Sequence, residues 1–343
     1  MYIENKPISK QISSWLLAMF LIVSIMIIVG GLTRLTDSGL SITQWELFTG
    51  ILPPLNETKW NFYFELYKET TEYKLQNYFM TLADFKIIFW WEFIHRFLGR
   101  LIGIFYFFPL VFFTIKIGFK KTKNLFIIFL LICFQGFIGW YMVSSGLVNR
   151  VDVSHYRLSI HLVLAFIILS LILFNFLKFN KNLVSVKKIN YMVPISFLFL
   201  IFIQISIGAF VSGMDAGKIY NTWPLMGMNY FPDDNNIENL FNLSAFDDPS
   251  LVQFIHRNLA YIIFLFYLLI LFYINKNQLT VFYTTIYLIG FLLFIQILLG
   301  IFTLISGAQI LISSMHQISS IFLVSSSVYL LYLNSKINLQ PSD

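Results

Sequence analysis

Charge and cysteine are both scarce in this sequence. Charged residues make up 12% of its 343 positions, against about 25% in an average soluble domain, and cysteine occurs once. A single cysteine excludes an intramolecular disulfide, and so little charge excludes an ordinary soluble domain. Apolar residues are abundant instead, at 58% of the chain. Because this composition suits a lipid environment, we expect a membrane protein.

Eight runs of about 20 apolar residues are long enough to cross about 30 Å of hydrocarbon as α-helices. They lie at about 15–33, 93–115, 124–146, 157–177, 190–212, 254–274, 281–305 and 310–333. The first run is too long for the apolar core of a signal peptide, and no clean small-residue cleavage site precedes Gly30, so we interpret it as a retained helix. The sequence therefore predicts an all-α integral membrane protein with eight transmembrane helices.

Lysines gather at alternate ends of these spans, for example Lys10, then Lys116 and Lys120, then Lys178, then Lys276. This is the positive-inside pattern, so the net charge of +6 indicates membrane topology and does not predict nucleic-acid binding. It predicts that both termini are cytoplasmic and that two long loops, at about 34–91 and 213–252, are outside. The segment before the first span is not rich in arginine, which favours a bacterial inner membrane over an organelle.

An internal repeat divides the chain into two halves. Phe93-Ile94-His95-Arg96 returns as Phe254-Ile255-His256-Arg257, and Gln135 and Gly139 return at the same offset as Gln296 and Gly300. The exits of the first helix of each half also match, at another offset: Gly30, Asp37, Gly39 and Trp45 correspond to Gly208, Asp215, Gly217 and Trp223. We predict two pseudo-symmetric four-helix bundles, at 1–180 and 181–343, in parallel orientation because each contains an even number of spans.

Four of the five histidines fall about one turn inside the outer ends of the even-numbered spans: His95, His161, His256 and His316. They are predicted at similar depth, two in each half. An intramembrane histidine can simply bond a neighbouring carbonyl, but ionisable groups at this depth usually mark function, and four at matched depth favour a shared ligand. His155 is at the repeat offset from His316, yet its segment is polar and external, so we predict His161 as the partner.

Imidazole binds heme iron, copper and zinc. A copper or zinc site would add cysteine, methionine or carboxylate ligands at the same depth, where only Glu92 is available. Two axial histidines in a cavity rich in phenylalanine and leucine fit heme better. Arg96 and Arg257, with Arg100 and Arg157, lie close by in sequence. They either pair with heme propionates or extend toward the membrane surface, and both interpretations stay open.

The halves differ where Glu92 matches Gln253, each three residues before a histidine and so on the same helix face. Only the amino half keeps an acid. A carboxyl group beside a heme could transfer protons or stabilise a cation, and the alternative is an ion pair with Arg96 or a solvated helix entrance. The asymmetry suggests a reactive heme in the amino half and a retained electron-carrying heme in the other.

Eight motifs together resemble one enzyme family, heme A synthase of the mitochondrial and alphaproteobacterial type, over nearly the whole chain. They are Gly30-Gly31-Leu32-Thr33-Arg34, Glu92-Phe93-Ile94-His95-Arg96, Gln135-Gly136-Phe137-Ile138-Gly139, Tyr156-Arg157-Leu158-Ser159-Ile160-His161, Asp215-Ala216-Gly217-Lys218, Asn221-Thr222-Trp223-Pro224, Gln253-Phe254-Ile255-His256-Arg257 and His316-Gln317.

The resemblance implies an oxidoreductase that converts the C8 methyl group of its substrate, heme O, to a formyl group, giving heme A for terminal oxidases. By position, His95 and His161 would flank heme O and Glu92 would assist catalysis. His256 and His316 would ligate a heme B cofactor, with Arg96 and Arg257 near the propionates. Membrane lipid surrounds such a protein, and heme O synthase, oxidase assembly factors, a redox partner or a second copy of the chain are candidate partners.

A diheme b-type membrane electron carrier is the main alternative, because it needs the same four histidines and no reaction at a heme substituent. A transporter is disfavoured by the absence of paired Gly/Pro-interrupted spans. A prenyltransferase would need Asp-rich diphosphate motifs, and the acids here are scattered in an outer loop. The cysteine pair that some members of the family carry in the first outer loop is missing from 34–91.

Overall fold

The computed structural model describes residues 6–46, 49–148, 150–179 and 189–335. Across these ranges the chain is almost wholly helical and contains no β-strand. The predicted boundary between the halves, at 180/181, and the first five residues of the amino-terminal segment lie outside the described residues.

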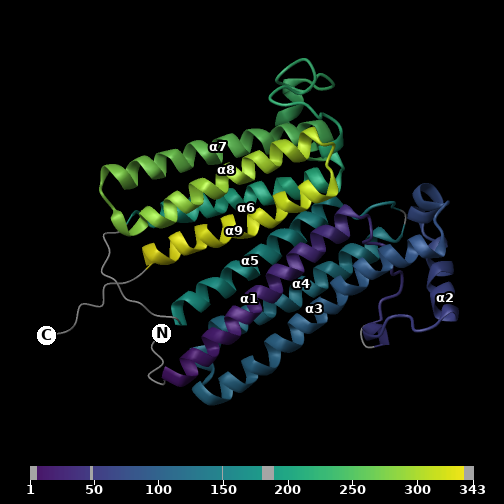
Figure 1. Cartoon of the computed structure of the whole chain (residues 1–343), viewed down its shortest axis with the longest axis horizontal. Coiled ribbons are helices and arrows are strands. Elements are labelled where there is room, and N and C mark those ends of the chain that lie inside the picture. Colours follow the sequence, from purple (N-terminus) through teal and green to yellow (C-terminus); the bar gives the residue numbers. More distant parts are fainter. Residues whose placement is uncertain (1–5, 47–48, 149, 180–188, 336–343) are drawn as a thin grey trace.

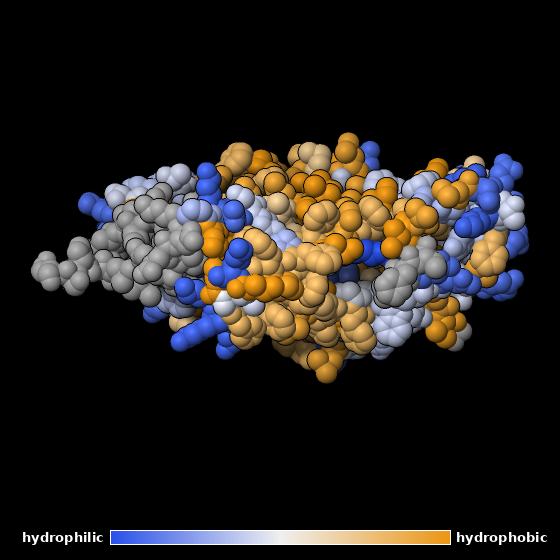
Figure 2. All heavy atoms as spheres, turned by 90° about the horizontal axis from the view of Figure 1, so that it is seen from below, coloured by the Kyte–Doolittle hydropathy of each residue, from blue (hydrophilic) through white to orange (hydrophobic). Residues whose placement is uncertain are grey.

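Eight helices of the described chain are long and apolar enough to cross a membrane, which confirms the predicted all-α membrane class. They are α1 (Lys6–Leu35), α3 (Leu82–Ile117), α4 (Phe119–Gly146), α5 (His155–Phe179), α6 (Met192–Gly213), α7 (Pro249–Lys276), α8 (Tyr283–Ile305) and α9 (Ile310–Ser335). A short helix, α2 (Glu57–Lys68), lies in the first long loop. Figure 2 shows apolar residues around the middle of the molecule and hydrophilic residues at both ends.

Helix α3 begins about three turns before the apolar run that predicted it. Its first turn is fixed by a capping box, in which Thr81 and Asp84 each bond the other's backbone. The helix has 36 residues and so reaches about 54 Å, well beyond the thickness of the hydrocarbon. Its outer turns are covered by α2, where Trp60 packs edge-on against Phe89 and Tyr67 stacks on Phe85. The first outer loop is correspondingly shorter than predicted.

The spanning helices form two groups of four, α1 with α3, α4 and α5, and α6 with α7, α8 and α9 (Figure 1). The groups meet through α1 and α5 on one side and α6 and α9 on the other. Ser159 of α5 bonds Ser206 of α6 at 2.7 Å. Gln317 of α9 lies directly against Gly31 of α1 and donates to the carbonyl of Ile27 at 2.9 Å. Close packing between the groups thus depends on small and polar residues, as in other membrane helix contacts.

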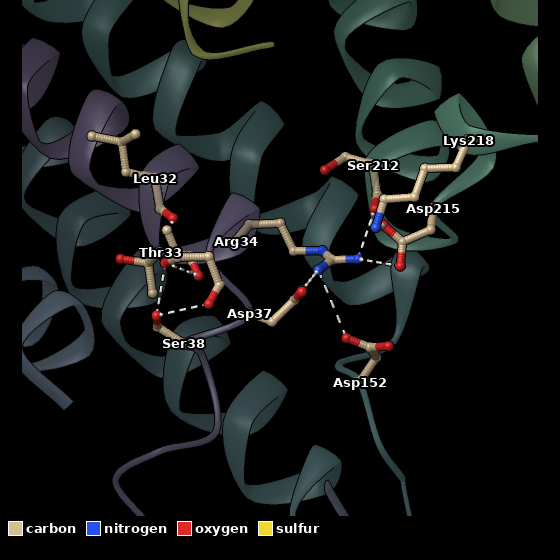
Figure 3. Close-up of polar contacts among 10 residues, drawn as sticks. Leu32, Thr33, Arg34, Asp37, Ser38, Asp152, Ser212, Asp215 and Lys218 are labelled. Carbon is tan, nitrogen blue, oxygen red and sulfur yellow. Dashed lines mark hydrogen bonds and ion pairs between the residues drawn. The ribbon is translucent and has the colours of Figure 1, made fainter. Parts of the chain in front are cut away.

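Arg34, at the end of α1, joins the two groups at their outer ends (Figure 3). Its guanidinium lies 2.5 Å from Asp37 and 3.7 Å from both Asp152 and Asp215, and it donates to the carbonyl of Ser212 at 2.8 Å. Asp37 and Asp215, predicted to be equivalent in the repeat, both have left-handed backbones, with φ of 48° and 51°. One cation therefore holds matching turns of the two groups together.

We expect Arg34→Gln to lower the stability of the purified protein in detergent by about 1 kcal/mol, because three aspartates then lose their shared cation. The effect is small because the aspartates are 38–52% exposed and water screens their repulsion. Thermal unfolding at low and high salt measures it, and salt should narrow the difference from the wild type. Lys218→Gln, which removes an exposed partner of Asp215, is the matched control and should change little.

Candidate functional site

Each of the four histidines lies against a glycine on the neighbouring helix. A Cβ atom built on that glycine would be 2.9 Å from the histidine Cε1 atom in the first group, closer than real side chains approach, and 3.0 to 3.1 Å in the second group, which is tighter than most real contacts. The pairs are His95 with Gly30, His161 with Gly139, His256 with Gly208 and His316 with Gly300. A side chain at these positions would therefore push against the imidazole, most strongly at Gly30 and Gly139.

A glutamine one turn before the glycine holds three of these histidines. The Nε2 atoms of Gln135, Gln204 and Gln296 donate to the backbone carbonyls of His161, His256 and His316 at 2.9, 3.0 and 3.1 Å. The first two amides also lie 3.2 Å from the Nδ1 atom of their imidazole. Gln135 and Gln204 thus fix both the position and the ring orientation of their histidines, and Gln296 holds the backbone of His316.

His95 is the exception, because Met26 stands where the glutamine would be. The Met26 methyl group lies beside Gly99, one turn after His95. The Nδ1 atom of His95 is buried without a hydrogen-bond partner in the described structure, as is that of His316. The repeat in the sequence pairs Gln135 with Gln296 but does not reveal Gln204 or Met26. A glutamine four residues before a glycine occurs in three of the four odd-numbered spans. This spacing identifies Gln204, and its absence from the first span identifies Met26.

The structure brings His95 and His161 together, with ring centroids 6.4 Å apart. A metal–imidazole bond is about 2 Å long and each ring adds about 1 Å, so two imidazoles on opposite sides of one metal have centroids about 6 Å apart. His256 on α7 and His316 on α9 are the corresponding histidines of the second group. All four side chains are only partly buried, although helices surround them. The donors and the spacing fit a heme iron with two axial histidines.

Glu92 is almost fully buried and completely hydrogen-bonded. Its Oε1 atom accepts from Nε and Nη2 of Arg96 at 3.0 and 2.5 Å, and its Oε2 atom accepts from Ser41 Oγ at 2.7 Å and the amide of Ile42 at 2.8 Å. Arg96 also donates to the carbonyl of Ile42 at 2.8 Å. The ion pair between Glu92 and Arg96, one of the alternatives that the sequence left open, is therefore present. Through Ser41 and Ile42 it also connects the loop after α1 to α3.

The second group repeats this arrangement with a neutral residue. Arg257 donates to Gln253 Oε1 at 3.1 Å and to the carbonyl of Tyr220 at 3.0 Å, the position equivalent to Ile42. It also donates to the carbonyls of Thr222 and Leu225 at 3.0 and 3.3 Å, while its Nε atom is buried without a partner in the described structure. The two sites thus share one framework and differ in two ways. Glu92 accepts a hydrogen bond from the amide of Ile42 where Gln253 donates to the carbonyl of Tyr220, and Met26 stands in the first group where Gln204 stands in the second.

The other candidates lie outside the two histidine pairs. His155 is the first residue of α5, and its Nε2 atom is 3.2 Å from Asp247 while its ring packs on Phe210. It is therefore not part of the His95 site. Arg100 donates to the carbonyl of Glu46 at 2.8 Å, and Arg157 lies over the ring of Tyr141 and bonds Ser145.

These features define a multi-pass membrane protein with two partly buried histidine pairs, one of which has an acid beside it. Known proteins share the whole framework. The family COX15-CtaA, described as cytochrome oxidase assembly protein, matches residues 13–328. A protein of Pelagibacter ubique named heme A synthase is 48% identical over 98% of this chain and its own full length. Heme A synthases of Rickettsia bellii and Rickettsia prowazekii are 42% and 41% identical, covering 92% and 94% of this chain and 96% and 98% of their own.

The chain belongs to the COX15-CtaA family, in which these relatives are heme A synthases. The family resemblance inferred from the motifs is thereby confirmed, and heme is the ligand that both the family and the geometry of the histidines indicate.

We expect Gly139→Ala to destabilise the protein by about 1–3 kcal/mol, because the new methyl group would displace the His161 ring. Gly136→Ala, on the same helix, is the matched control, since nothing lies within 4 Å of the added atom. Thermal unfolding of both variants in detergent measures the difference. Equal stability of the two variants would contradict the close packing of glycine and imidazole.

Proposed function

We propose that this chain is a heme A synthase, which oxidises the C8 methyl group of heme O to a formyl group and so supplies heme A for terminal oxidases. The observation that carries the proposal is the difference between two otherwise matched histidine sites. Only the site of the amino-terminal half, at 1–180, has a carboxyl group, that of Glu92, one turn from a histidine. Bound heme supplies the redox chemistry, and the chain positions it.

In the amino-terminal half, His95 and His161 flank heme O and Glu92 assists the reaction. Arg96, Ser41 and the amide of Ile42 hold the Glu92 carboxylate in one place. A carboxylate held there can stabilise positive charge at the reacting edge of the substrate, or accept a proton by giving up one of these bonds. His95, without a glutamine, is the least restrained of the four histidines, which suits a site whose occupant must enter and leave.

In the carboxy-terminal half, at 181–343, His256 and His316 hold a heme B cofactor. Gln204 and Gln296 restrain both histidines, which suits a group that stays bound. The buried Nε atom of Arg257 is a free donor for a propionate of this heme. We propose the corresponding role for Arg96 in the other half, although its Nε donates to Glu92, so a propionate there would have to bind its Nη atoms.

The lysine pattern supports both described chain ends facing the cytoplasm, and the bacterial relatives support a bacterial inner membrane. The start of α1 and the end of α9 lie at the same end of the molecule, opposite α2 (Figure 1). Both histidine sites would then lie nearer the outer face. A heme O synthase, oxidase assembly factors, a redox partner and a second copy of the chain are proposed as partners by family alone.

We expect Glu92→Gln to lower heme A formation by roughly 100-fold or more while heme stays bound, because only the acid is lost. The variant should fold, since Gln253 already fills this place beside Arg257. Protein made with a source of heme O is purified in detergent, and its extracted hemes are separated by chromatography with mass detection. The wild type should yield heme B with heme A or hydroxylated heme O.

Two controls decide between the enzyme and a diheme electron carrier. Glu69→Gln, which changes an exposed acid outside both histidine sites, should leave heme A formation intact. Glu92→Ala should also suppress the oxidised hemes, with some loss of stability because Arg96 loses its counter-charge. Heme B as the sole product, despite available heme O, would refute the synthase and favour the electron carrier.

We expect Met26→Gln to slow the exchange of the heme in the amino-terminal half about fivefold, the value of one added hydrogen bond of about 1 kcal/mol. The measurement is the rate at which isotope-labelled heme O replaces the bound heme. Gln204→Met, the reciprocal change, should speed loss of heme from the other half. Unchanged rates in both variants would show that the glutamines do not govern heme retention.

A further inference from the structure

A second buried acid lies in the outer segment that covers α3. We call residues 57–77, α2 with the π-helical turn Tyr73–Asn77, the outer cap. The cap packs through Trp60, Phe64 and Tyr67 onto Phe85 and Phe89, the two turns of α3 that precede Glu92. Glu72 stands at the start of the π-helical turn and is only 3% exposed. Such turns are rare and often occur at functional sites.

The Glu72 carboxyl group has few partners for a buried charge. It hydrogen-bonds with the hydroxyl of Tyr67, which is itself fully buried and accepts from Asn77 Nδ2 at 2.8 Å. Its Oε2 atom is buried without a partner in the part of the chain that the structure describes. A carboxylate with one neutral donor is poorly compensated, whereas Glu92 has four bonds and an arginine.

The charges that act on Glu72 are also negative. They come from Glu92 on α3, from Asp37 after α1 and from Asp152 before α5. Burial, followed by repulsion from these three carboxylates, raises the pKa of Glu72 to about 8. Burial and Glu72 likewise raise the pKa of Tyr67. Arg34 and Arg96 are already paired with the same three acids.

We propose that Glu72 is a positioning residue that acts while it carries a proton, because its neutral carboxyl group fills buried space beside the outer cap without adding a further negative charge there. An ionised Glu72 would repel Glu92 and so disturb the pair with Arg96 that holds Glu92 in place. Its effect on the reaction rests on the proposed role of Glu92, whereas its protonation and its effect on stability do not.

Infrared spectroscopy tests the protonation directly. At pH 6.5 the difference between wild type and Glu72→Gln should contain the carbonyl band of one protonated carboxyl group, and this band should disappear as the pH rises through about 8. Glu69→Gln, which changes an exposed acid of the same cap, is the matched control and should give no such band. Absence of the band in the wild type would overturn the proposal, whatever the protein catalyses.

Stability provides a second readout that needs no heme. A folded-state pKa above the ordinary glutamate value of 4.5 means that the wild type loses stability relative to Glu72→Gln as the pH rises from about 4.5 to about 8. The difference between their thermal midpoints should therefore grow across this window and become constant above it. A difference that does not vary with pH would overturn the proposal.

The pH profile of heme A formation distinguishes positioning from proton transfer. If Glu72 positions, Glu72→Gln keeps activity below pH 8 and lacks the decline that the wild type shows as the pH rises through that value. Glu72→Ala should lose activity at every pH because the space is left open. Loss of activity at every pH in Glu72→Gln, with the infrared band present in the wild type, would overturn positioning and make Glu72 a group that exchanges protons.

Discussion

Close contact between imidazole and glycine is the constraint on which the rest of the structure depends. A histidine can project into a bundle of membrane helices only where the facing helix presents no side chain, and each of four glycines provides that room. The helix that carries the glycine also carries the residue one turn earlier that faces the histidine backbone. Three of the histidines are thus held by one glutamine and one glycine that lie four residues apart on the neighbouring helix.

The shared framework makes single differences between the halves informative. Glu92 and Gln253 occupy the same place, bond equivalent arginines and hold equivalent loop residues, yet one is charged. Burying an unpaired carboxylate costs folding free energy. Arg96 and the turn at Ser41 and Ile42 offset this cost for Glu92. The outer cap lies close to this pair, because it packs on Phe85 and Phe89 in the turns of α3 that precede Glu92.

Much of this architecture could be predicted from the sequence because membrane helices follow hydropathy and the repeat shows in its motifs. The eight spans, the family and the proximity of His95 and His161 are examples. The outer turns of α3 escaped prediction because α2 covers them, so their residues need not be continuously apolar. The burial of Glu72 depends on packing between segments far apart in the sequence, and no local pattern reports it. The hydrogen bonds of Arg96 to Glu92 and to the carbonyl of Ile42 could not be predicted either, because a sequence shows a charge but not its partner.

Two adjacent glycines of α1 connect the sites physically. Gly30 faces the ring of His95, while Gly31 faces Gln317, the residue after His316. At this level α1 presents only backbone, without side chains, to His95 of α3 and to Gln317 of α9. These glycines, together with the contact of Ser159 with Ser206, allow the two groups of helices to approach closely at this level. The absence of two side chains would thereby shorten the path of electrons between hemes bound at the two sites.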